Sequence, residues 1–166
     1  MTIIPSKNAD VSASNLRKVM SHYLTGVTIV TITKPDGSPY GLTVNSFNSV
    51  SLAPPLILWS LDNKNSNLGL FENTAGFAIN IMAADQTDLC RRFAGNDSDR
   101  FTGVDWTFGT SGQPLMTNAL AHIECRPWQT YAGGDHTIFV GEVTHAQHVS
   151  NRPAAAFFKG QLGHYE

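Results

Sequence analysis

Short runs of β-branched and aromatic residues, each ended by turn-forming residues, restrict most strongly how this chain can fold. The runs lie at residues 26–33, 42–52, 55–61, 76–83, 121–131 and 136–149. Val, Ile, Thr and the aromatic residues favour strands, whereas Gly, Pro, Asn and Asp favour turns. The turn residues at 34–41 (KPDGSPYG) join the first two runs into a predicted hairpin. Strands at such short spacing predict a mainly β fold, a barrel with a few short peripheral helices.

One amphipathic helix is predicted before the first strand. Four apolar side chains recur there at spacings of three and four residues: Leu16, Val19, Met20 and Tyr23. This spacing places side chains on one face of a helix. Ser12 or Ser14 would cap the helix, because a serine hydroxyl accepts a hydrogen bond from an unpaired amide of the first turn.

Three further short helices are predicted. Residues 65–74 form the first, and residues 85–94 form the second, which ends just before Gly95. The third begins at Pro153, since proline is tolerated in the first turn of a helix, and runs through Phe158.

Length and composition predict a single domain over residues 1–166, with residues 1–12 as a flexible N-terminal arm. Charged residues make up 14% of the chain, which is low for a soluble domain. A surface so poor in charge is often partly covered by another subunit, and we therefore predict a homodimer. The formal charge is −2 and no long run of like charge occurs, so neither nucleic acid nor a membrane surface is an expected partner.

Common catalytic and metal-binding signatures are absent from the sequence. It has no glycine-rich nicotinamide turn, no triphosphate loop and no G-x-S-x-G elbow. Cys90 and Cys125 have no C-x-x-C spacing, and no signal sequence leads the chain, which favours reduced thiols and a cytoplasmic location. His145 and His148 come closest to a metal motif, but on a strand they point to opposite faces, so no metal is predicted.

An uncharged polar face is predicted within the second β run. If residues 42–52 form one continuous strand, five side chains share a face: Thr43, Asn45, Phe47, Ser49 and Ser51. A solvated face would normally carry charge, and a core face would be aliphatic. Neutral donors and acceptors, with Ser46 and backbone amides among them, suit the polar edge of a buried planar heterocycle. The alternative is an edge strand whose hydroxyls are satisfied by water.

Two basic segments lie at predicted helix ends. A helix N-terminus presents unpaired amides, and Lys64 with Ser66 would add a charge and a hydroxyl for binding a phosphate. The alternative is a capped helix with a solvated lysine. Arg91 and Arg92 form the second basic segment, which the helix dipole alone can explain.

The segment GGDH at 133–136 precedes a strong β run. Its two glycines would let backbone approach a ligand closely, and His136 could then lie over that ligand. The alternative is an ordinary surface histidine.

Together and in this order, these segments resemble a known family. TGVTIVT, TVNSFNSVSLAPPL, LDNKNSN, RRFAG, DRF, GDHTIFVGEV and FFKGQLGHY are similar to segments of the flavin reductase family, which supplies reduced flavin to two-component monooxygenases. The resemblance extends from about residue 17 to the end of the chain. It implies a flavin-binding split β-barrel, a homodimeric active form and a separate flavin-dependent monooxygenase as partner.

The resemblance also implies roles for individual residues. Contacts with the flavin ring and ribityl chain are implied for Thr43, Asn45, Ser46, Phe47, Ser49 and Ser51. Contacts with the flavin phosphate are implied for Lys64 and Ser66, with help from Arg91, Phe93 and Ala94. His136 would be the catalytic residue beside the nicotinamide, and Phe158 and Tyr165 would close the pocket.

The reaction of this family would explain why no acid–base pair stands out. Hydride transfer from C4 of NADH or NADPH to N5 of FMN or FAD is cofactor chemistry, in which a protein mainly aligns the rings and stabilises developing charge. Two alternatives stay open: a split barrel that keeps FMN permanently as an oxidase or electron carrier, and a non-catalytic barrel that binds flavin as a sensor or store.

Overall fold

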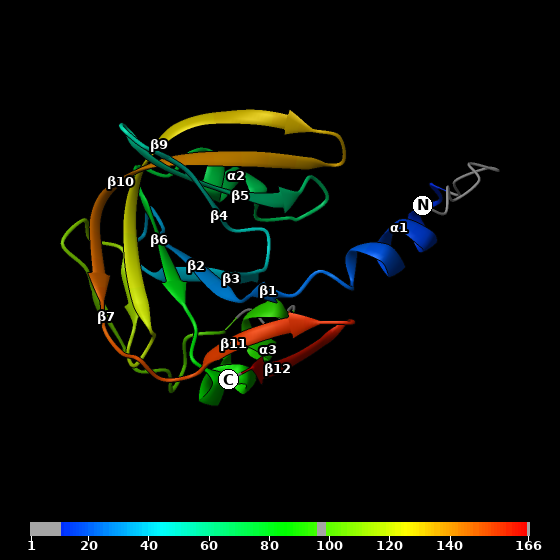
Figure 1. Cartoon of the computed structure of the whole chain (residues 1–166). Coiled ribbons are helices and arrows are strands. Elements are labelled where there is room, and N and C mark those ends of the chain that lie inside the picture. The colour runs from blue at the N-terminus through cyan, green and yellow to red at the C-terminus, as the bar shows by residue number, and fades with distance from the viewer. Residues whose placement is uncertain (1–10, 96–98, 166) are drawn as a thin grey trace.

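The structure of the protein is a computed structural model that describes residues 11–95 and 99–165 (Figure 1). Its helices are α1 (Ala13–Met20), α2 (Leu68–Glu72), the short 3-10 helix η1 (Ala84–Gln86) and α3 (Thr87–Ala94). Its strands are β1 (Thr25–Gly26), β2 (Thr28–Thr33), β3 (Pro39–Val44), β4 (Asn48–Leu52), β5 (Pro55–Asp62), β6 (Phe77–Ile81), β7 (Trp106–Phe108), β8 (Pro114–Met116), β9 (Ala121–Gly133), β10 (His136–His148), β11 (Ala154–Phe158) and β12 (Gln161–Tyr165). The mainly β prediction is confirmed. Residues 1–10 of the predicted N-terminal arm lie outside the described residues.

Seven strands form a strongly curved antiparallel sheet in the order β3-β2-β6-β9-β10-β5-β4 (Figure 1). Its two edge strands, β3 and β4, are consecutive in the chain, so the polypeptide crosses from one edge of the sheet to the other after Val44. Strands β1, β11 and β12 form a separate sheet, and β7 pairs with β8. The crossing segment, residues 45–47, positions the candidate site described below.

Residues 42–52 do not form the single strand that the sequence predicts. β3 ends at Val44 and β4 begins at Asn48, and a register shift follows between Ser49 and Ser51. The prediction that alternate residues of this run share one face is therefore wrong. The reason is topological: β3 pairs with β2 and β4 pairs with β5, at opposite edges of one sheet.

The predicted helix from Pro153 through Phe158 is also wrong, because Ala154–Phe158 forms β11 between β1 and β12. Pairing with β12 on one side and β1 on the other outweighs the preference of proline for a first helical turn. Strands β7, β8 and β12 are short and lack β-branched runs, which explains why the sequence does not reveal them.

The other predicted helices are confirmed with shorter bounds. The hydroxyl of Ser12 caps α1 by accepting a hydrogen bond from the amide of Asn15 at 3.4 Å, and Gly95 follows the last residue of α3. No residue of α1 is buried, so its apolar stripe stays exposed. Within the described ranges, no helix combines the length and apolar character needed to cross a membrane.

Aromatic side chains form the centre of the core. Trp59 of β5 stacks on Phe139 of β10 with ring centroids 4.5 Å apart, and Phe71 of α2 packs edge-on against Trp59 at 5.1 Å. Such paired rings add to the stabilisation from burial itself. The cysteines predicted to be reduced, Cys90 and Cys125, are free and buried, and burial raises the pKa of each thiol to about 12.

Glu124 of β9 is a buried carboxylate that fixes the loop between β7 and β8. It accepts hydrogen bonds from the amides of Thr110 at 3.1 Å and Ser111 at 2.6 Å, and from the Ser111 hydroxyl. A Cβ atom at Gly109 would lie 2.6 Å from the carboxylate, so this close approach requires glycine. Burial alone would raise the pKa of Glu124, but the hydrogen bonds from Ser111 and Thr110 outweigh it and lower the pKa.

Replacing Glu124 with Gln should destabilise the fold at neutral pH and matter less in acid. A lowered folded-state pKa means that the carboxylate stabilises the fold above its unfolded-state pKa and loses this effect as the pH falls through the folded-state pKa. We expect E124Q to lower the free energy of unfolding by about 1–3 kcal/mol at pH 7, measured by urea denaturation. The difference should shrink below about pH 4, near the pKa of an unfolded glutamate. An undiminished difference there would contradict the role of the ionised carboxylate.

Candidate functional site

A cavity of about 730 Å³ lies where the crossing segment meets the end of α1 and the β11–β12 hairpin. We call it the main cavity. It is lined by residues 45–48, by Thr25 and Gly26 of β1, and by Phe157 and Gly160 of the hairpin. Its volume lies within the range of cofactor and small-molecule sites.

Ser46 holds the crossing segment in place. Its hydroxyl donates a hydrogen bond to the carbonyl of Ser60 at 3.1 Å and accepts one from the amide of Ser60 at 2.9 Å. One side chain thereby satisfies both backbone groups of a β5 residue at the point where β4 pairing has ended. The neighbouring residues Asn45 and Phe47 are thus held at the cavity, and their predicted flavin contacts stay predictions.

Uncharged polar groups mark the wall of the main cavity. The hydroxyl oxygen of Thr25 is buried and has no hydrogen-bond partner within residues 11–95 and 99–165. A buried polar atom normally finds a partner, so this hydroxyl is available to a bound molecule. The exposed side chain of Asn45 adds an amide with two donors and an acceptor.

A second group of predicted residues meets where the β5–α2 turn contacts the β9–β10 turn. The amide of Asn63 donates to the carbonyl of Asp135 at 2.9 Å, and Thr137 donates to the side-chain oxygen of Asn63 at 2.9 Å. These bonds bring Lys64 into the electrostatic environment of Asp135. The hydrogen bond and charge of His136, and then the charge of Lys64, lower the pKa of Asp135.

The Asp135 carboxylate also orients the imidazole of His136. Nδ1 of His136 lies 2.7 Å from Oδ1 of Asp135. Because an ionised carboxylate can only accept a hydrogen bond, Nδ1 carries the proton and donates it. Nε2 is then left to face a ligand, as an acceptor in the neutral ring or as a donor in the protonated one.

The two groups are related through the pairing of β5 with β10. Ser46 is bonded to Ser60, which is the register partner of Ile138, while His136 pairs with Asp62. His136 is therefore one two-residue repeat further along the sheet, which is about 7 Å. His136 and Ile138 share a face of β10, because alternate residues of a strand point the same way. The crossing segment and His136 are thus linked to the neighbouring strands β5 and β10 of one sheet, and contact of both with one ligand stays a prediction.

Several predicted residues lie away from the main cavity. Thr43 donates its hydroxyl to the carbonyl of Cys90 at 2.8 Å, which joins β3 to α3. Ser49 is exposed on β4, and the hydroxyl of Ser51 accepts from the amide of Ala53 at 3.3 Å in the following turn. Their proposed flavin contacts stay predictions.

The predicted phosphate-binding residues are also outside the main cavity lining. Arg91 forms an exposed ion pair with Asp88 at 2.7 Å. Phe93 is buried with its ring centroid 5.0 Å from that of Phe101, and Ala94 is the last residue of α3. Lys64 and Ser66 are exposed before α2, and the N-cap of that helix is Asn67. The contacts of these five residues with the flavin phosphate stay predictions.

The predicted closing residues belong to the β11–β12 hairpin. The ring of Phe158 packs edge-on against His22 at 6.4 Å, and the amide of Lys159 donates to the carbonyl of Ser21 at 2.8 Å. These contacts join the hairpin to the end of α1 beside the main cavity. Tyr165 is the last residue of β12, and its side chain lies outside the described part of the structure.

Sequence reasoning did not identify several residues that line the cavity. They come from α1, the residues after it, β1, the first residue of β4 and the hairpin: Arg17, Met20, Ser21, Tyr23, Leu24, Thr25, Gly26, Asn48, Phe157 and Gly160. The two ends of the chain converge here by packing, which no local pattern reveals. The one available signal is the segment TGV, where Thr25 and Gly26 begin the first motif of the resemblance.

Comparisons with known proteins point to one family. A family model described as "Flavin reductase like domain" matches residues 20–166. The chain is 42% identical to the FMN reductase (NADH) SmoA of Agrobacterium fabrum over 154 residues, which are 93% of this chain and 87% of that protein. It is 35% identical to HsaB of Rhodococcus jostii, the reductase subunit of a flavin-dependent monooxygenase, over 91% of this chain and 77% of that protein.

A solved structure agrees in sequence and in shape. It is the NADH:FAD oxidoreductase SgcE6 of Streptomyces globisporus in complex with NAD and FAD fragments. The TM-score is 0.87 at 38% sequence identity, and the match covers 92% of each chain.

Removing the Ser46 hydroxyl should loosen the crossing segment. Ser46→Ala leaves the amide and carbonyl of Ser60 without their side-chain partner, so we expect the free energy of unfolding to fall by about 1–3 kcal/mol. The matched control is Ser49→Ala, an exposed serine on the next strand, which should change that free energy by less than about 0.5 kcal/mol. Urea denaturation of both variants measures the difference, and equal effects would refute the anchoring role of Ser46.

Proposed function

This chain belongs to the flavin reductase-like family, and from that membership we propose that its main cavity binds FMN or FAD beside NADH or NADPH. The protein is an NAD(P)H-dependent flavin reductase, which transfers hydride to flavin and supplies reduced flavin to a separate monooxygenase. The observation that carries this assignment is the uncharged, hydrogen-bonding wall formed by Thr25 and residues 45–47.

The residues present fit a flavin. The ring system is planar and apolar on its faces but has donors and acceptors along its edge. The main cavity offers Phe47 for a face of the ring, and the Thr25 hydroxyl and Asn45 amide for its edge. The unpartnered hydroxyl of Thr25 would gain the partner that a buried polar atom needs.

The protein's task in this reaction is alignment. When bound, the flavin supplies the acceptor for a hydride from NAD(P)H. Ser46 fixes the crossing segment, so that Asn45 and the backbone amides beside it are preorganised as hydrogen-bond donors. Phe157 of the hairpin adds an apolar side chain to the cavity wall, which would help to keep water from the reacting rings. No titrating acid–base pair is required, which agrees with the uncharged groups of Thr25 and residues 45–47; among the residues that the structure describes, Arg17 is the one charged residue in the lining.

We propose that the remaining predicted residues bind the flavin phosphate and the nicotinamide, or close the pocket. Lys64 and Ser66 would bind the flavin phosphate, with Arg91, Phe93 and Ala94 nearby. His136 would contact the nicotinamide through Nε2, because Asp135 engages Nδ1. Phe158 and Tyr165 would close the pocket from the hairpin side.

We also propose that the active form is a homodimer. The apolar stripe of α1 is exposed although amphipathic helices normally bury that face, and Trp128 and Tyr131 of β9 are about half exposed. Apolar surface of this kind favours contact with a second copy. Sedimentation equilibrium should give twice the chain mass of 18.0 kDa, and a monomer mass would refute the dimer.

The two buried free thiols support a reducing, cytoplasmic compartment, which we propose as the location. The relatives reported above are named as reductases. This favours flavin reduction over the permanently bound and non-catalytic alternatives.

The decisive assay follows oxidation of NADH and NADPH with FMN, FAD or riboflavin in turn. We expect turnover with at least one pair, and flavin lost from the protein on gel filtration. Tight binding of flavin without turnover would support the sensor or store, and turnover with retained flavin would support the permanently bound form.

Lys64→Ala should weaken FMN binding without affecting riboflavin. Removing a charge-assisted hydrogen bond to a phosphate costs about 1.5 kcal/mol or more, so the Kd for FMN should rise about tenfold. Riboflavin has no phosphate and serves as the control ligand. Fluorescence titration measures both, and equal weakening would show that Lys64 does not bind the phosphate.

His136→Ala should raise the KM for NAD(P)H about tenfold while the Kd for flavin stays within about twofold, since the imidazole is assigned to the nicotinamide. His148→Ala, at the other end of β10, is the matched control and should change neither constant. Steady-state kinetics and flavin titration give both values. An equal loss for both ligands would place His136 elsewhere.

A further inference from the structure

The β11–β12 hairpin forms part of the wall of the main cavity, yet it is not part of the seven-stranded sheet. It pairs with β1 through two register positions, Thr25 with Phe157 and Gly26 with Ala156. Phe157 and Gly160 line the main cavity. The shape of the cavity on this side therefore depends on how the hairpin is attached at its base.

Residues 149–153 connect β10 to β11, and they pass below the seven-stranded sheet to the base of the hairpin (Figure 1). The amide of Ala84 donates to the carbonyl of Pro153 at 2.8 Å, and the amide of Ala155 donates to the carbonyl of Met82 at 2.9 Å. We call residues 149–153 the strap.

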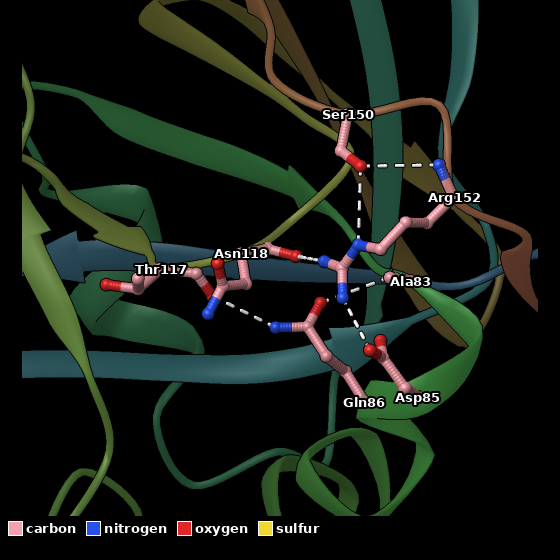
Figure 2. Close-up of polar contacts among 7 residues, drawn as sticks. All are labelled: Ala83, Asp85, Gln86, Thr117, Asn118, Ser150 and Arg152. Carbon is pink, nitrogen blue, oxygen red and sulfur yellow. Dashed lines mark hydrogen bonds and ion pairs between the residues drawn. The ribbon is translucent and has the colours of Figure 1, made fainter.

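One side chain, Arg152, joins the strap to two other segments. Figure 2 shows its guanidinium between the carboxylate of Asp85, the carbonyl of Asn118 and the hydroxyl of Ser150. Nη1 lies 2.5 Å from Oδ2 of Asp85, Nη2 donates to the carbonyl of Asn118, and Nε donates to Oγ of Ser150 at 3.3 Å. Arg152 thus connects the strap to η1 and to the turn before β9.

The two segments that Arg152 contacts, η1 and the turn before β9, are also bonded to each other independently of Arg152. Gln86 accepts a hydrogen bond from the amide of Ala83 at 3.1 Å and donates to the carbonyl of Thr117 at 3.0 Å (Figure 2). Loss of the Arg152 side chain therefore leaves its acceptors in place and loosens mainly the strap, which keeps its backbone hydrogen bonds with Ala84 and Leu120. The expected consequence is a displaced hairpin in a folded chain.

We propose that Arg152 is a positioning residue for the reductase reaction: by tying the strap to Asp85 and Asn118, it sets the place of Phe157 and Gly160 in the cavity wall. The proposal rests on the reductase function proposed above. In that function the flavin contacts the crossing segment, so the hairpin bounds the space left for the nicotinamide. Hydride transfer needs the two rings in near contact, and a shifted wall weakens nicotinamide binding before it affects flavin binding.

The substitutions that test this are Arg152→Ala, Arg152→Lys and Asp85→Asn. For R152A we expect the KM for NAD(P)H to rise about fivefold, with kcat and the Kd for flavin within about twofold. R152K should recover only part of the loss, because one ammonium cannot replace a planar fork that reaches Asp85, Asn118 and Ser150. The double variant R152A/D85N should be no worse than R152A, since R152A has already removed the contact that D85N removes.

Lys34→Ala is the matched control. It removes a surface ion pair with Asp36 in the turn after β2, at the end of that strand remote from β1. It should leave the KM, kcat and flavin affinity unchanged. A rise in KM equal to that of R152A would show a general response to lost surface charge and would overturn the proposal.

Backbone amide exchange tests the strap independently of activity. In R152A, with no ligand added, amides of β11 and β12 should exchange faster, while amides of β9 and β10 keep their wild-type rates. Unchanged exchange in β11 and β12, or a fall in kcat at constant KM, would overturn the positioning role. Failure of the wild-type protein to oxidise NAD(P)H with flavin would refute the proposed function, and amide exchange would still decide whether Arg152 holds the hairpin.

Discussion

The pair of hydrogen bonds between the Ser46 hydroxyl and the backbone of Ser60 is the interaction on which the site depends. The chain must cross from one edge of the curved sheet to the other between β3 and β4, and a crossing segment has no strand partner of its own. Ser46 supplies the missing connection with one side chain. Asn45 and Phe47, its two neighbours, are then fixed at the cavity although they lie outside the sheet. Rigid support for a polar segment is what a site for a planar heterocycle requires.

The remaining walls come from distant parts of the chain. α1 and β1 contribute from the N-terminal side, and the β11–β12 hairpin from the C-terminal side, so the cavity is closed by both ends of the sequence. His136 lies on β10 and pairs with Asp62 of β5, the strand to which Ser46 is bonded. A cavity with an uncharged wall at the crossing segment suits hydride transfer, in which alignment of two rings matters more than proton movement.

The sequence predicted the mainly β fold, the long strands and most helices, because these elements follow from local preference and periodicity. It failed where tertiary pairing decides. Residues 42–52 were predicted as one strand, but pairing at opposite edges of the sheet divides them. Ala154–Phe158 was predicted as a helix, but pairing with β12 makes it a strand. Asn45, Ser46 and Phe47 line the cavity, and their predicted flavin contacts stay predictions. Thr25 was missed, since its unpartnered hydroxyl becomes visible only in three dimensions.

A crystal structure of the protein with FMN or FAD tests the central claim most directly, namely that the crossing segment holds the flavin ring. We expect the polar edge of the ring to accept hydrogen bonds from residues 45–47, with the Thr25 hydroxyl within hydrogen-bond distance of the ligand. A ring bound elsewhere, with the crossing segment facing solvent, would contradict the assignment of this cavity.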